Sequence, residues 1–244
     1  MSASAHTRVD WQDVAAGPGA AVTVARLLAG HLQRALAQPG DALLALAGGR
    51  TPEEPFRRLA ALPCDWQRVH IVPTDERWVP LGHADCNESM LRRCFERAGG
   101  AGPRFLSLRG NATELPAAVA DARRALAAHA GLLALTLLGV GADGHIASLF
   151  PGAPELAAAM AADAPHAVYS VHPTPAAPPP PVPRLTLGLR RLLHTRQVVL
   201  LFGGADKRRV VEAARRAPDP LRVPVGALFQ AGLPPVQVIY LEGV

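Results

Sequence analysis

The chain has 244 residues, of which 49% are apolar and 18% charged, a composition typical of a globular protein with a sizeable core. No apolar stretch reaches the roughly 20 residues that a membrane-spanning helix needs, and the N-terminal residues lack the charged-then-apolar order of a secretory signal. The formal charge of +5 comes from arginines scattered among acids rather than clustered in a basic stripe, so we expect a soluble, cytoplasmic protein that binds neither membranes nor nucleic acid.

Short apolar runs alternate along the chain with segments of helical spacing. The runs predict strands at 42–47, 69–73, 132–138, 167–171, 198–202 and 236–240. The spacing predicts helices at 18–37, 52–61, 87–97, 114–130, 185–194, 206–216 and 224–231. Because these strands lack polar alternation and are separated by helices, the fold class expected is α/β, with a parallel sheet covered on both faces. We see no internal repeat and no linker, so residues 1–244 are expected to form a single domain.

Ligands of such sheets bind beyond the carboxyl ends of the strands, so the residues just after each predicted strand are the candidates for chemistry. After the first strand, Thr51 fits a helix N-cap, Pro52 the first helical position, and Glu54 a capping box. Gly48 and Gly49 precede them, and paired glycines let backbone N–H groups approach an anion at a helix N-terminus. The stretch is equally compatible with a simple helix start and with a phosphate cradle.

The second predicted strand ends in PTDERWVP (73–80), which brings Asp75, Glu76 and Arg77 to the same edge of the sheet, with DCNES downstream at 85–89. A charged turn in this position is often only solvated. Its place at a strand end favours a site, because arginine can fork onto carbonyl or phosphoryl oxygens while an adjacent acid holds it.

The third strand runs into GVGADGHIASLFP (139–151), which contains a G-x-G-x-x-G pattern. The pattern lies in mid-chain, and Pro151 and Pro154 interrupt the segment after it, so an NAD-binding fingerprint is disfavoured. His145 is either a buried histidine that the backbone satisfies or a general base at the ligand crevice. The imidazole titrates near neutrality and the glycines allow close approach of a substrate, so we favour the base.

The fourth strand leads into GGADKRRVV, in which Asp206 and Lys207 open a helix. Lys207 is the only lysine of the chain, and a cation in a first helical turn is disfavoured by the helix dipole unless an anion binds there. The alternative is that Lys207 points into water. Arg184, where the proline-rich segment 173–183 meets the predicted helix at 185–194, is a further candidate for contact with an anion. The proline-rich segment itself is expected to form a stiff extended loop.

Several common sites are not indicated. The sequence has no G-x-S-x-G elbow, no paired-histidine metal pattern and no P-loop. Cys64, Cys86 and Cys94 show no CxxC spacing, so neither a disulfide framework nor a zinc–thiolate site is predicted. We therefore expect no metal.

Taken together, AGGRTP, DERWVP with DCNES, GVGADGHIASLFPG, PRLTL and GGADK, spread in this order over residues 47–207, resemble the 6-phosphogluconolactonases of the pentose phosphate pathway. The resemblance implies a three-layer α/β domain shared with glucosamine-6-phosphate deaminase and ribose-5-phosphate isomerase. It implies no metal, no organic cofactor, and hydrolysis of 6-phospho-D-glucono-1,5-lactone to 6-phosphogluconate. We expect a monomer or small homo-oligomer. The chain departs from the family pattern at Ala47, Cys86 and Ile146, where serine, serine and threonine are usual.

The resulting hypothesis assigns a role to each candidate. His145 removes a proton from the attacking water, Arg77 stabilises the oxyanion or orients the sugar, and either Asp75 or Asp143 tunes these groups. The phosphate is held by Gly48, Gly49, Thr51, Arg184 and Lys207. The rivals are an isomerase or deaminase of glucosamine 6-phosphate, a sugar-phosphate sensor that binds without turnover and, more distantly, an NAD-dependent dehydrogenase.

Overall fold

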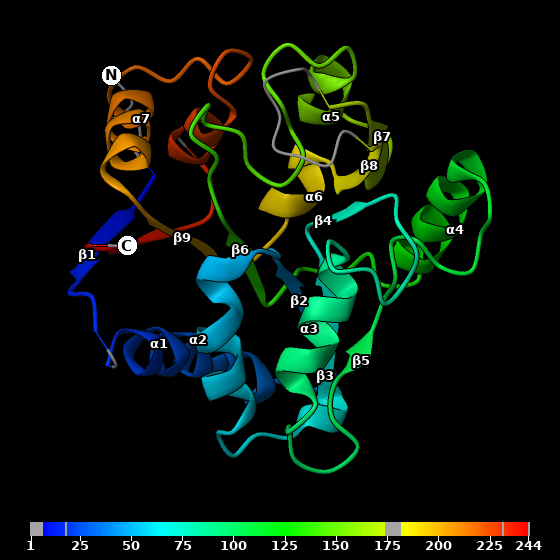
Figure 1. Ribbon diagram of the computed structural model, residues 1–244, viewed down its shortest axis with the longest axis vertical. Coiled ribbons are helices and arrows are strands. Elements are labelled where there is room, and N and C mark those ends of the chain that lie inside the picture. Colours follow the sequence, from blue (N-terminus) through cyan, green and yellow to red (C-terminus); the bar gives the residue numbers. More distant parts are fainter. Residues whose placement is uncertain (1–6, 18, 174–181, 231, 244) are drawn as a thin grey trace.

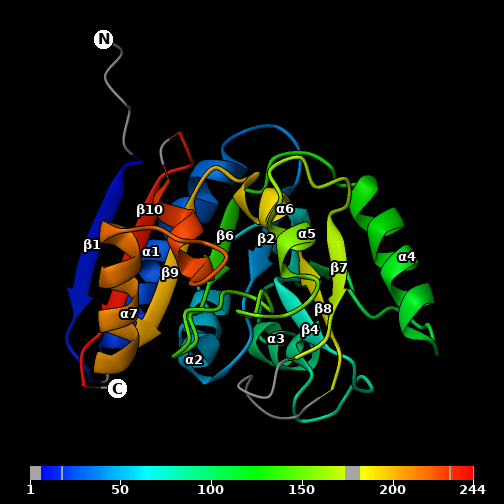
Figure 2. The same ribbon diagram turned by 90° about the horizontal axis from the view of Figure 1, so that it is seen from above.

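The computed structural model describes residues 7–17, 19–173, 182–230 and 232–243. Its centre is a seven-stranded sheet in the order β1-β10-β9-β6-β2-β3-β5 (Figures 1 and 2). Every pairing in this sheet is parallel. The strands are Val9–Val14 (β1), Ala42–Leu46 (β2), Val69–Pro73 (β3), Arg104–Phe105 (β5), Leu135–Leu138 (β6), Val198–Gly203 (β9) and Val236–Leu241 (β10).

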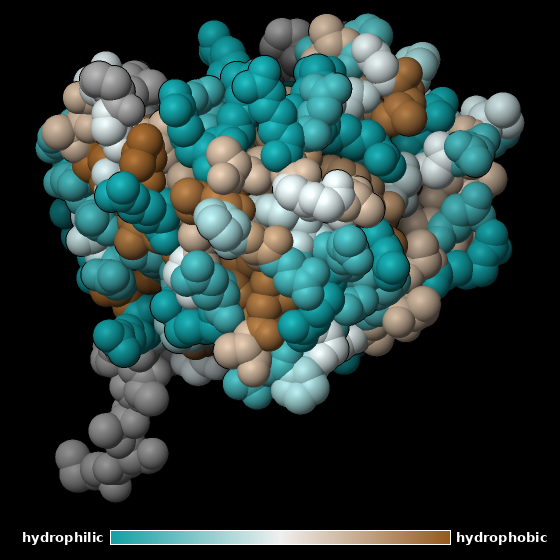
Figure 3. All heavy atoms as spheres, turned by 90° about the horizontal axis from the view of Figure 1, so that it is seen from below, coloured by the Kyte–Doolittle hydropathy of each residue, from teal (hydrophilic) through white to brown (hydrophobic). Residues whose placement is uncertain are grey.

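Helices cover both faces of the sheet, which confirms the expected α/β class and its three layers. In β9, Val199 and Leu201 pack with one set of helices, whereas Val198, Leu200 and Phe202 pack with the other. The first set is Ala20–Leu36 (α1), Arg50–Ala60 (α2) and Asn87–Phe95 (α3), and its outer surface is mostly hydrophilic (Figure 3). The second is Leu115–Ala127 (α4), Leu156–Met160 (α5), Leu189–Leu193 (α6), Ala205–Arg216 (α7) and the 3₁₀ segment Pro224–Phe229 (η2).

A second, three-stranded antiparallel sheet corrects two of the sequence-based predictions. It consists of Asp75–Arg77 (β4), Arg184–Leu187 (β8) and Val168–Val171 (β7), in the order β4-β8-β7. The strand predicted at 167–171 therefore exists but lies outside the main sheet. The helix predicted at 185–194 is wrong in its first part, because residues 184–187 form strand β8, which pairs with β4 and β7. The second part of the prediction is confirmed by α6.

Other elements escaped the sequence-based prediction. Strand β1 has the polar pattern VDWQDV because it lies at the edge of the sheet and pairs only with β10. Strand β5 is two residues long, and α5 has five residues between loops. The helix predicted at 224–231 is the 3₁₀ segment η2. Of the predicted proline-rich loop, residues 174–181 lie outside the described part of the chain.

The parallel arrangement brings the carboxyl ends of β2, β3, β6 and β9 to one edge of the sheet, where the chain passes into the four loops that the sequence analysis singled out. From β3 the chain continues through Thr74 directly into β4. The small sheet therefore stands beside the same edge. Within the described ranges, no helix has the length and apolar character needed to cross a membrane.

Candidate active site

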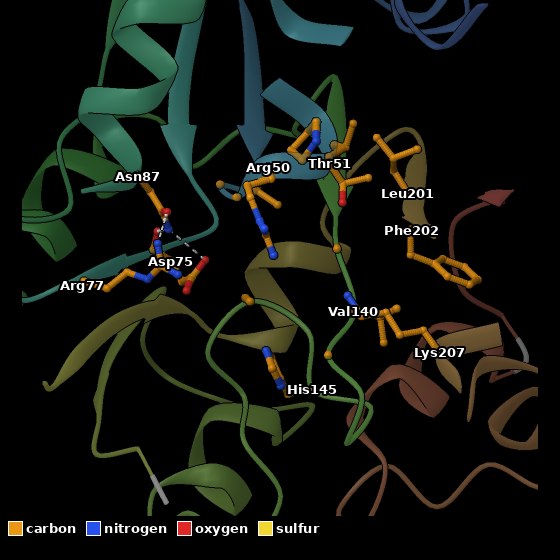
Figure 4. A pocket seen from close by; sticks show the side chains of 18 residues that line it. Arg50, Thr51, Asp75, Arg77, Asn87, Val140, His145, Leu201, Phe202 and Lys207 are labelled. Carbon is orange, nitrogen blue, oxygen red and sulfur yellow. Dashed lines mark hydrogen bonds between the residues drawn. The ribbon is translucent and has the colours of Figure 1, made fainter. Parts of the chain in front are cut away.

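A cleft of about 280 Å³ opens at the carboxyl ends of the parallel strands. It gathers residues from the loops after β2 and β6, from β4, β6 and β9, and from the starts of α2, α3 and α7. Figure 4 shows Arg50 and His145 reaching in from opposite walls, Asp75, Arg77 and Asn87 on one side, and Lys207 on the other. The remaining lining residues are Ala47, Gly48, Gly49, Thr51, Pro52, Leu137, Gly139, Val140, Gly141, Ala147, Leu201 and Phe202.

The glycine loop after β2 forms the entrance to α2. Gly49 is the N-cap residue, with a φ of 96° that favours glycine, and the helix begins at Arg50. The predicted capping box is therefore wrong: Thr51 lies inside the first turn and makes no cap, and Glu54 instead pairs with Arg58 at 2.7 Å. The loop still points the N-terminus of α2, with its N–H groups, at the cleft, as a phosphate cradle requires.

Gly48 is needed because the side chain of Asn87 fills the space above it. A Cβ atom at position 48 would lie 2.0 Å from Asn87 Oδ1. Asn87 Oδ1 accepts a hydrogen bond from Arg77 Nη1 at 2.7 Å, and Asn87 Nδ2 donates to the Asp75 carbonyl at 2.7 Å. Arg77 Nη1 also donates to the Asp85 carbonyl at 3.1 Å, so the guanidinium is held at a fixed place on the cleft wall. Sequence reasoning noted DCNES but did not assign Asn87 to the site.

Glu76 organises this wall from behind. Its carboxylate is 1% exposed and accepts hydrogen bonds from the backbone N–H groups of Arg77, Asn87 and Glu88, at 2.8, 2.8 and 2.7 Å. Burial raises the pKa of Glu76 to about 6, although the three hydrogen bonds act in the opposite direction. The carboxylate thus ties β4 to the N-terminus of α3, where an anion is favoured.

Cys86 is the N-cap residue at the start of α3. Its Sγ accepts a hydrogen bond from the backbone N–H of Ser89 at 3.4 Å. Burial raises the pKa of the Cys86 thiol. The side chain is therefore a structural cap and stays protonated rather than acting as a thiolate nucleophile.

The loop after β6 presents His145 on the opposite wall. His145 Nδ1 lies 2.5 Å from Asp143 Oδ1, and the imidazole packs 4.8 Å from the ring of Phe150. Burial acts to raise the pKa of Asp143, but its hydrogen bonds and charge interaction with His145 outweigh burial, and the pKa is lowered. The histidine side chain remains 15% exposed and lines the cleft together with Gly48 and Gly49, so it is not sealed in the core.

This tight arrangement depends on glycine at position 141. A Cβ atom there would lie 2.1 Å from His145 Nδ1 and 2.6 Å from Asp143 Oδ1. Gly141 of GVGADGH therefore makes room for a histidine–aspartate pair. Of the two acids that the sequence left open, Asp143 is the one that contacts His145.

Asp75 has a different partner, which the sequence did not indicate. Its Oδ2 accepts a hydrogen bond from Ser148 Oγ at 2.6 Å, across 73 residues of sequence. Ser148 comes directly after Ala147, which has a φ of 48° and is the sole non-glycine residue with positive φ in the described ranges. The Ser148–Asp75 hydrogen bond thus fixes the histidine loop to the strand that carries Arg77.

The cleft is positively charged. Arg50, Arg77 and Lys207 line it, whereas Asp75 is its one carboxylate among described residues. Lys207 lies in the first turn of α7, as expected, and has no ion-pair partner in the part of the chain that the structure describes. Arg50 was not predicted as a site residue, although it stands between the glycines and Thr51.

Arg184 is the one predicted site residue that does not line the cleft. It opens β8, opposite Arg77 in the β4–β8 register, and is 2% exposed. Burial, followed by repulsion from Arg77, lowers the pKa of Arg184. Its contact with phosphate stays a prediction. No group of three or more His, Cys, Asp or Glu side chains in the described ranges is placed to hold a metal ion.

Known proteins are similar to this chain in both sequence and fold. The family model for glucosamine-6-phosphate isomerases and 6-phosphogluconolactonases matches residues 18–234. A 6-phosphogluconolactonase of Mesorhizobium japonicum is 34% identical over 231 residues, 95% of this chain and 94% of the relative. One of Pseudomonas aeruginosa is 37% identical over 206 residues, 84% of this chain and 85% of the relative.

Solved structures agree. The crystal structure of a 6-phosphogluconolactonase from Shewanella baltica has a TM-score of 0.84 and 28% identity, and the match covers 96% of this chain and 97% of that one. A monomeric glucosamine-6-phosphate deaminase, at 21% identity and a TM-score of 0.75, shares the fold. The chain therefore belongs to the family of glucosamine-6-phosphate isomerases and 6-phosphogluconolactonases.

Proposed function

We propose that this protein hydrolyses 6-phospho-D-glucono-1,5-lactone to 6-phospho-D-gluconate. The observation that carries the proposal is the pairing of His145 with Asp143 on the wall of a cleft whose other charged side chains are mainly cations. Relatives that are 34% and 37% identical over most of their length bear the name 6-phosphogluconolactonase. A sugar-phosphate lactone offers an anionic group for the cations and an ester carbon for an attacking water.

The phosphate is assigned to the wall formed by the N-termini of α2 and α7. Gly48, Gly49 and Thr51 supply backbone N–H groups and a hydroxyl, and Lys207 supplies a charge. Arg50 lines the same wall and joins this group. Binding energy from the phosphate, which does not react, positions the lactone carbonyl beside the histidine.

His145 acts as the general base. Because the Asp143 carboxylate accepts the hydrogen bond of His145 Nδ1–H, the lone pair lies on Nε2, which takes a proton from the attacking water. The new C–O bond gives a tetrahedral oxyanion, which Arg77 stabilises. When the oxyanion collapses, the bond between the carbonyl carbon and the ring oxygen breaks, and the imidazolium returns its proton to that oxygen. Asp75 accepts a hydrogen bond from Ser148 and lies near Asn87. Its role is to position the cleft wall that carries Arg77, and it does not react itself.

The direct test adds purified protein, with excess chelator, to freshly prepared 6-phosphogluconolactone and measures acid release above the spontaneous rate. We expect chelator-resistant acceleration. Release of ammonia from glucosamine 6-phosphate without lactone hydrolysis would instead assign the isomerase chemistry of the family. Calorimetric binding of the lactone or of 6-phosphogluconate without acid release would point to a sensor.

The His145→Ala variant tests the base. We expect kcat to fall by about 10²–10⁴-fold while the protein stays folded, because the proton acceptor is lost but the cleft walls remain. The control is His166→Ala, which removes an exposed histidine that is not part of the cleft. Initial rates of acid release and circular dichroism measure the two effects. A His145→Ala enzyme with nearly the activity of the control would remove His145 from the role of base.

A further inference from the structure

A second cavity, of about 390 Å³, lies at the opposite end of the parallel sheet. It is bounded by the start of β10, by residues just before β9 and at the start of β1, and by one side of α1. The active-site cleft lies beyond the carboxyl end of β9, whereas this cavity lies by its amino end, so the two share no lining residue. The lining residues are Arg8, Asp10, Arg26, Leu27, Gly30, His31, Arg34, Gln197, Pro235, Val236 and Gln237.

The wall of this cavity contains a polar chain of three side chains. Arg34 Nη2 lies 2.8 Å from His31 Nδ1, and His31 Nε2 lies 2.9 Å from Gln237 Oε1. Arginine only donates, so His31 Nδ1 must accept, and the single proton of the neutral imidazole is on Nε2. Burial, aided by the charge of Arg34, lowers the pKa of His31, which agrees with a neutral ring.

The histidine tautomer determines which way the Gln237 amide faces. His31 Nε2–H donates, so the atom of Gln237 that faces it must be the carbonyl oxygen. The Gln237 amino group therefore points away from His31. Among the described residues no hydrogen bond from this amino group to the protein is found, and the group is not one of the fully enclosed polar atoms, so it opens to the cavity that Gln237 lines. The chain of hydrogen bonds thus presents a free N–H₂ donor from a residue that lines the cavity.

Packing alone does not account for this donor. Gln237 lies in β10 between Val236 and Val238, and apolar residues occupy most of the strand's other positions. A leucine at position 237 would pack against the same neighbours without presenting a polar amide to the cavity. His31 belongs to the helix face that otherwise carries Val24, Leu28 and Leu32. Two polar side chains thus lie together at one place between helix and sheet, and that place borders the cavity.

The other charged side chains around the cavity are mainly cations. Arg8, Arg26 and Arg34 line it, and Asp10 is the single acid among its lining residues. Neither Arg8 nor Arg26 has an ion-pair partner in the described ranges. A metal ion would meet an excess of donors and positive charge here, and an apolar molecule would leave the Gln237 amino group unpaired. An oxyanion would satisfy both the amide and the guanidinium groups.

We infer that this cavity is a second binding site, remote from the catalytic cleft, for the phosphate or carboxylate group of a small molecule. The Gln237 amino group and the guanidinium groups of Arg26 and Arg8 donate to the anion. The volume of about 390 Å³ is that of a metabolite site rather than of a macromolecular surface. The inference does not depend on the reaction proposed for the cleft.

The experiment is a titration of the isotopically labelled full-length protein with inorganic phosphate, in which NMR monitors the side-chain amide resonance of Gln237. A parallel titration uses malonate, which separates phosphoryl from carboxylate recognition. Gln237→Leu identifies the resonance. The Lys207→Ala variant is titrated as well, because phosphate also reaches the catalytic cleft in the proposed function. Arg26→Gln removes a charge from the cavity, and Arg97→Gln removes a similarly exposed charge elsewhere on the surface.

We expect the Gln237 resonance to shift saturably with phosphate, malonate or both, in the wild type and in Lys207→Ala alike. Arg26→Gln should weaken that binding about tenfold or more, whereas Arg97→Gln leaves it unchanged. Arg26→Gln should also retain the wild-type rate of lactone hydrolysis. A response that does not saturate with either anion, or that is equal in Arg26→Gln and Arg97→Gln, overturns the inference. Loss of lactone hydrolysis in all proteins would instead concern the proposed function.

Discussion

The side chain of Asn87 explains much of the active-site wall at the scale of single residues. It lies against Gly48, accepts from Arg77 and donates to the Asp75 carbonyl, so one amide connects the glycine loop to the strand of the arginine. No local pattern in DCNES predicts that Asn87 connects these two segments. Asn87 gains it because α3 brings its first residue to the end of β2.

Gly48→Ala tests that contact. The added Cβ would lie 2.0 Å from Asn87 Oδ1, so Asn87 must move and release Arg77. We expect kcat/KM for the lactone to fall by up to about 10²-fold, because small displacements of positioning groups are costly to catalysis. Gly131→Ala is the control, since a Cβ at that exposed position meets nothing within 4 Å. Equal activity of the two variants would show that Asn87 does not hold the arginine.

Glu76 gives a prediction for the pH dependence of stability. Its pKa is raised to about 6 in the folded chain from 4.5, so the folded state favours the protonated form. The contribution is therefore fully present below a pH of about 4.5 and is lost as the pH rises through about 6. Relative to Glu76→Gln, which does not titrate, the free energy of unfolding of the wild type should fall by about 2 kcal/mol across this range. Urea unfolding at several pH values measures it, and a difference independent of pH would contradict the shifted pKa.

At the scale of elements, α7 carries a cation where helices disfavour one. Lys207 lies in the first turn, close to the positive end of the helix dipole, whereas Arg215 and Arg216 occupy the favourable last turn. The arrangement is unfavourable in the empty protein and favourable when an anion lies between α7 and the glycine loop. In the proposed function, this position of Lys207 would favour binding of the phosphate group.

The Lys207→Ala variant should separate the effect of Lys207 on anion binding from its effect on the stability of the empty protein. We expect KM for the lactone to rise about tenfold or more with little change in kcat, because the phosphate loses a charged partner that does not take part in the reaction. Without substrate, the free energy of unfolding should stay the same or rise by up to about 1 kcal/mol. Arg216→Ala, at the other end of the same helix, should leave KM unchanged and slightly destabilise the protein. An unchanged KM in Lys207→Ala would take Lys207 out of the phosphate site.

At the scale of the whole molecule, the active site forms where two sheets meet. The parallel sheet contributes the glycine loop and the histidine loop, and the small antiparallel sheet contributes Asp75 and Arg77. The Ser148–Asp75 hydrogen bond joins the two parts, and Thr186 of β8 accepts the backbone N–H of Ser148 at 3.2 Å. The alignment of the histidine loop with Arg77 therefore depends on how the two sheets are held together.

Ser148→Ala tests this connection. Asp75 would lose its 2.6 Å donor, so the histidine loop and the arginine strand would be less firmly aligned. We expect kcat to fall about tenfold or more with a smaller change in KM, and stability to fall by about 1–3 kcal/mol. Ser107→Ala, which removes a serine hydrogen bond to the backbone of Gly110 outside the cleft, is the control for lost stability alone. A kcat equal to that of Ser107→Ala would mean that the connection serves stability only.

The sequence by itself determined the α/β class, the family and most of the cleft. Gly48, Gly49, Arg77, His145 and Lys207 could be found because they come after apolar strands, and parallel pairing brings all such strand ends to one edge. The family assignment is confirmed by the match over residues 18–234. The fold class and the strand ends depend on local periodicity and on a general rule of parallel sheets, whereas the family came from the resemblance of the motifs at those strand ends.

Only the tertiary structure decided the partners of those residues. Arg184 belongs to a strand because β4 and β7 pair with it from both sides, which overrides the helical spacing of the residues after it. Asp75 meets Ser148 across 73 residues, and His31 meets Gln237 across 206. Such contacts arise from the packing of distant segments. The sequence around one partner does not indicate which residue the other partner is. The acid beside the histidine is a different case, because Asp143 lies only two residues before His145 and the turn of the loop after β6 brings the two side chains together.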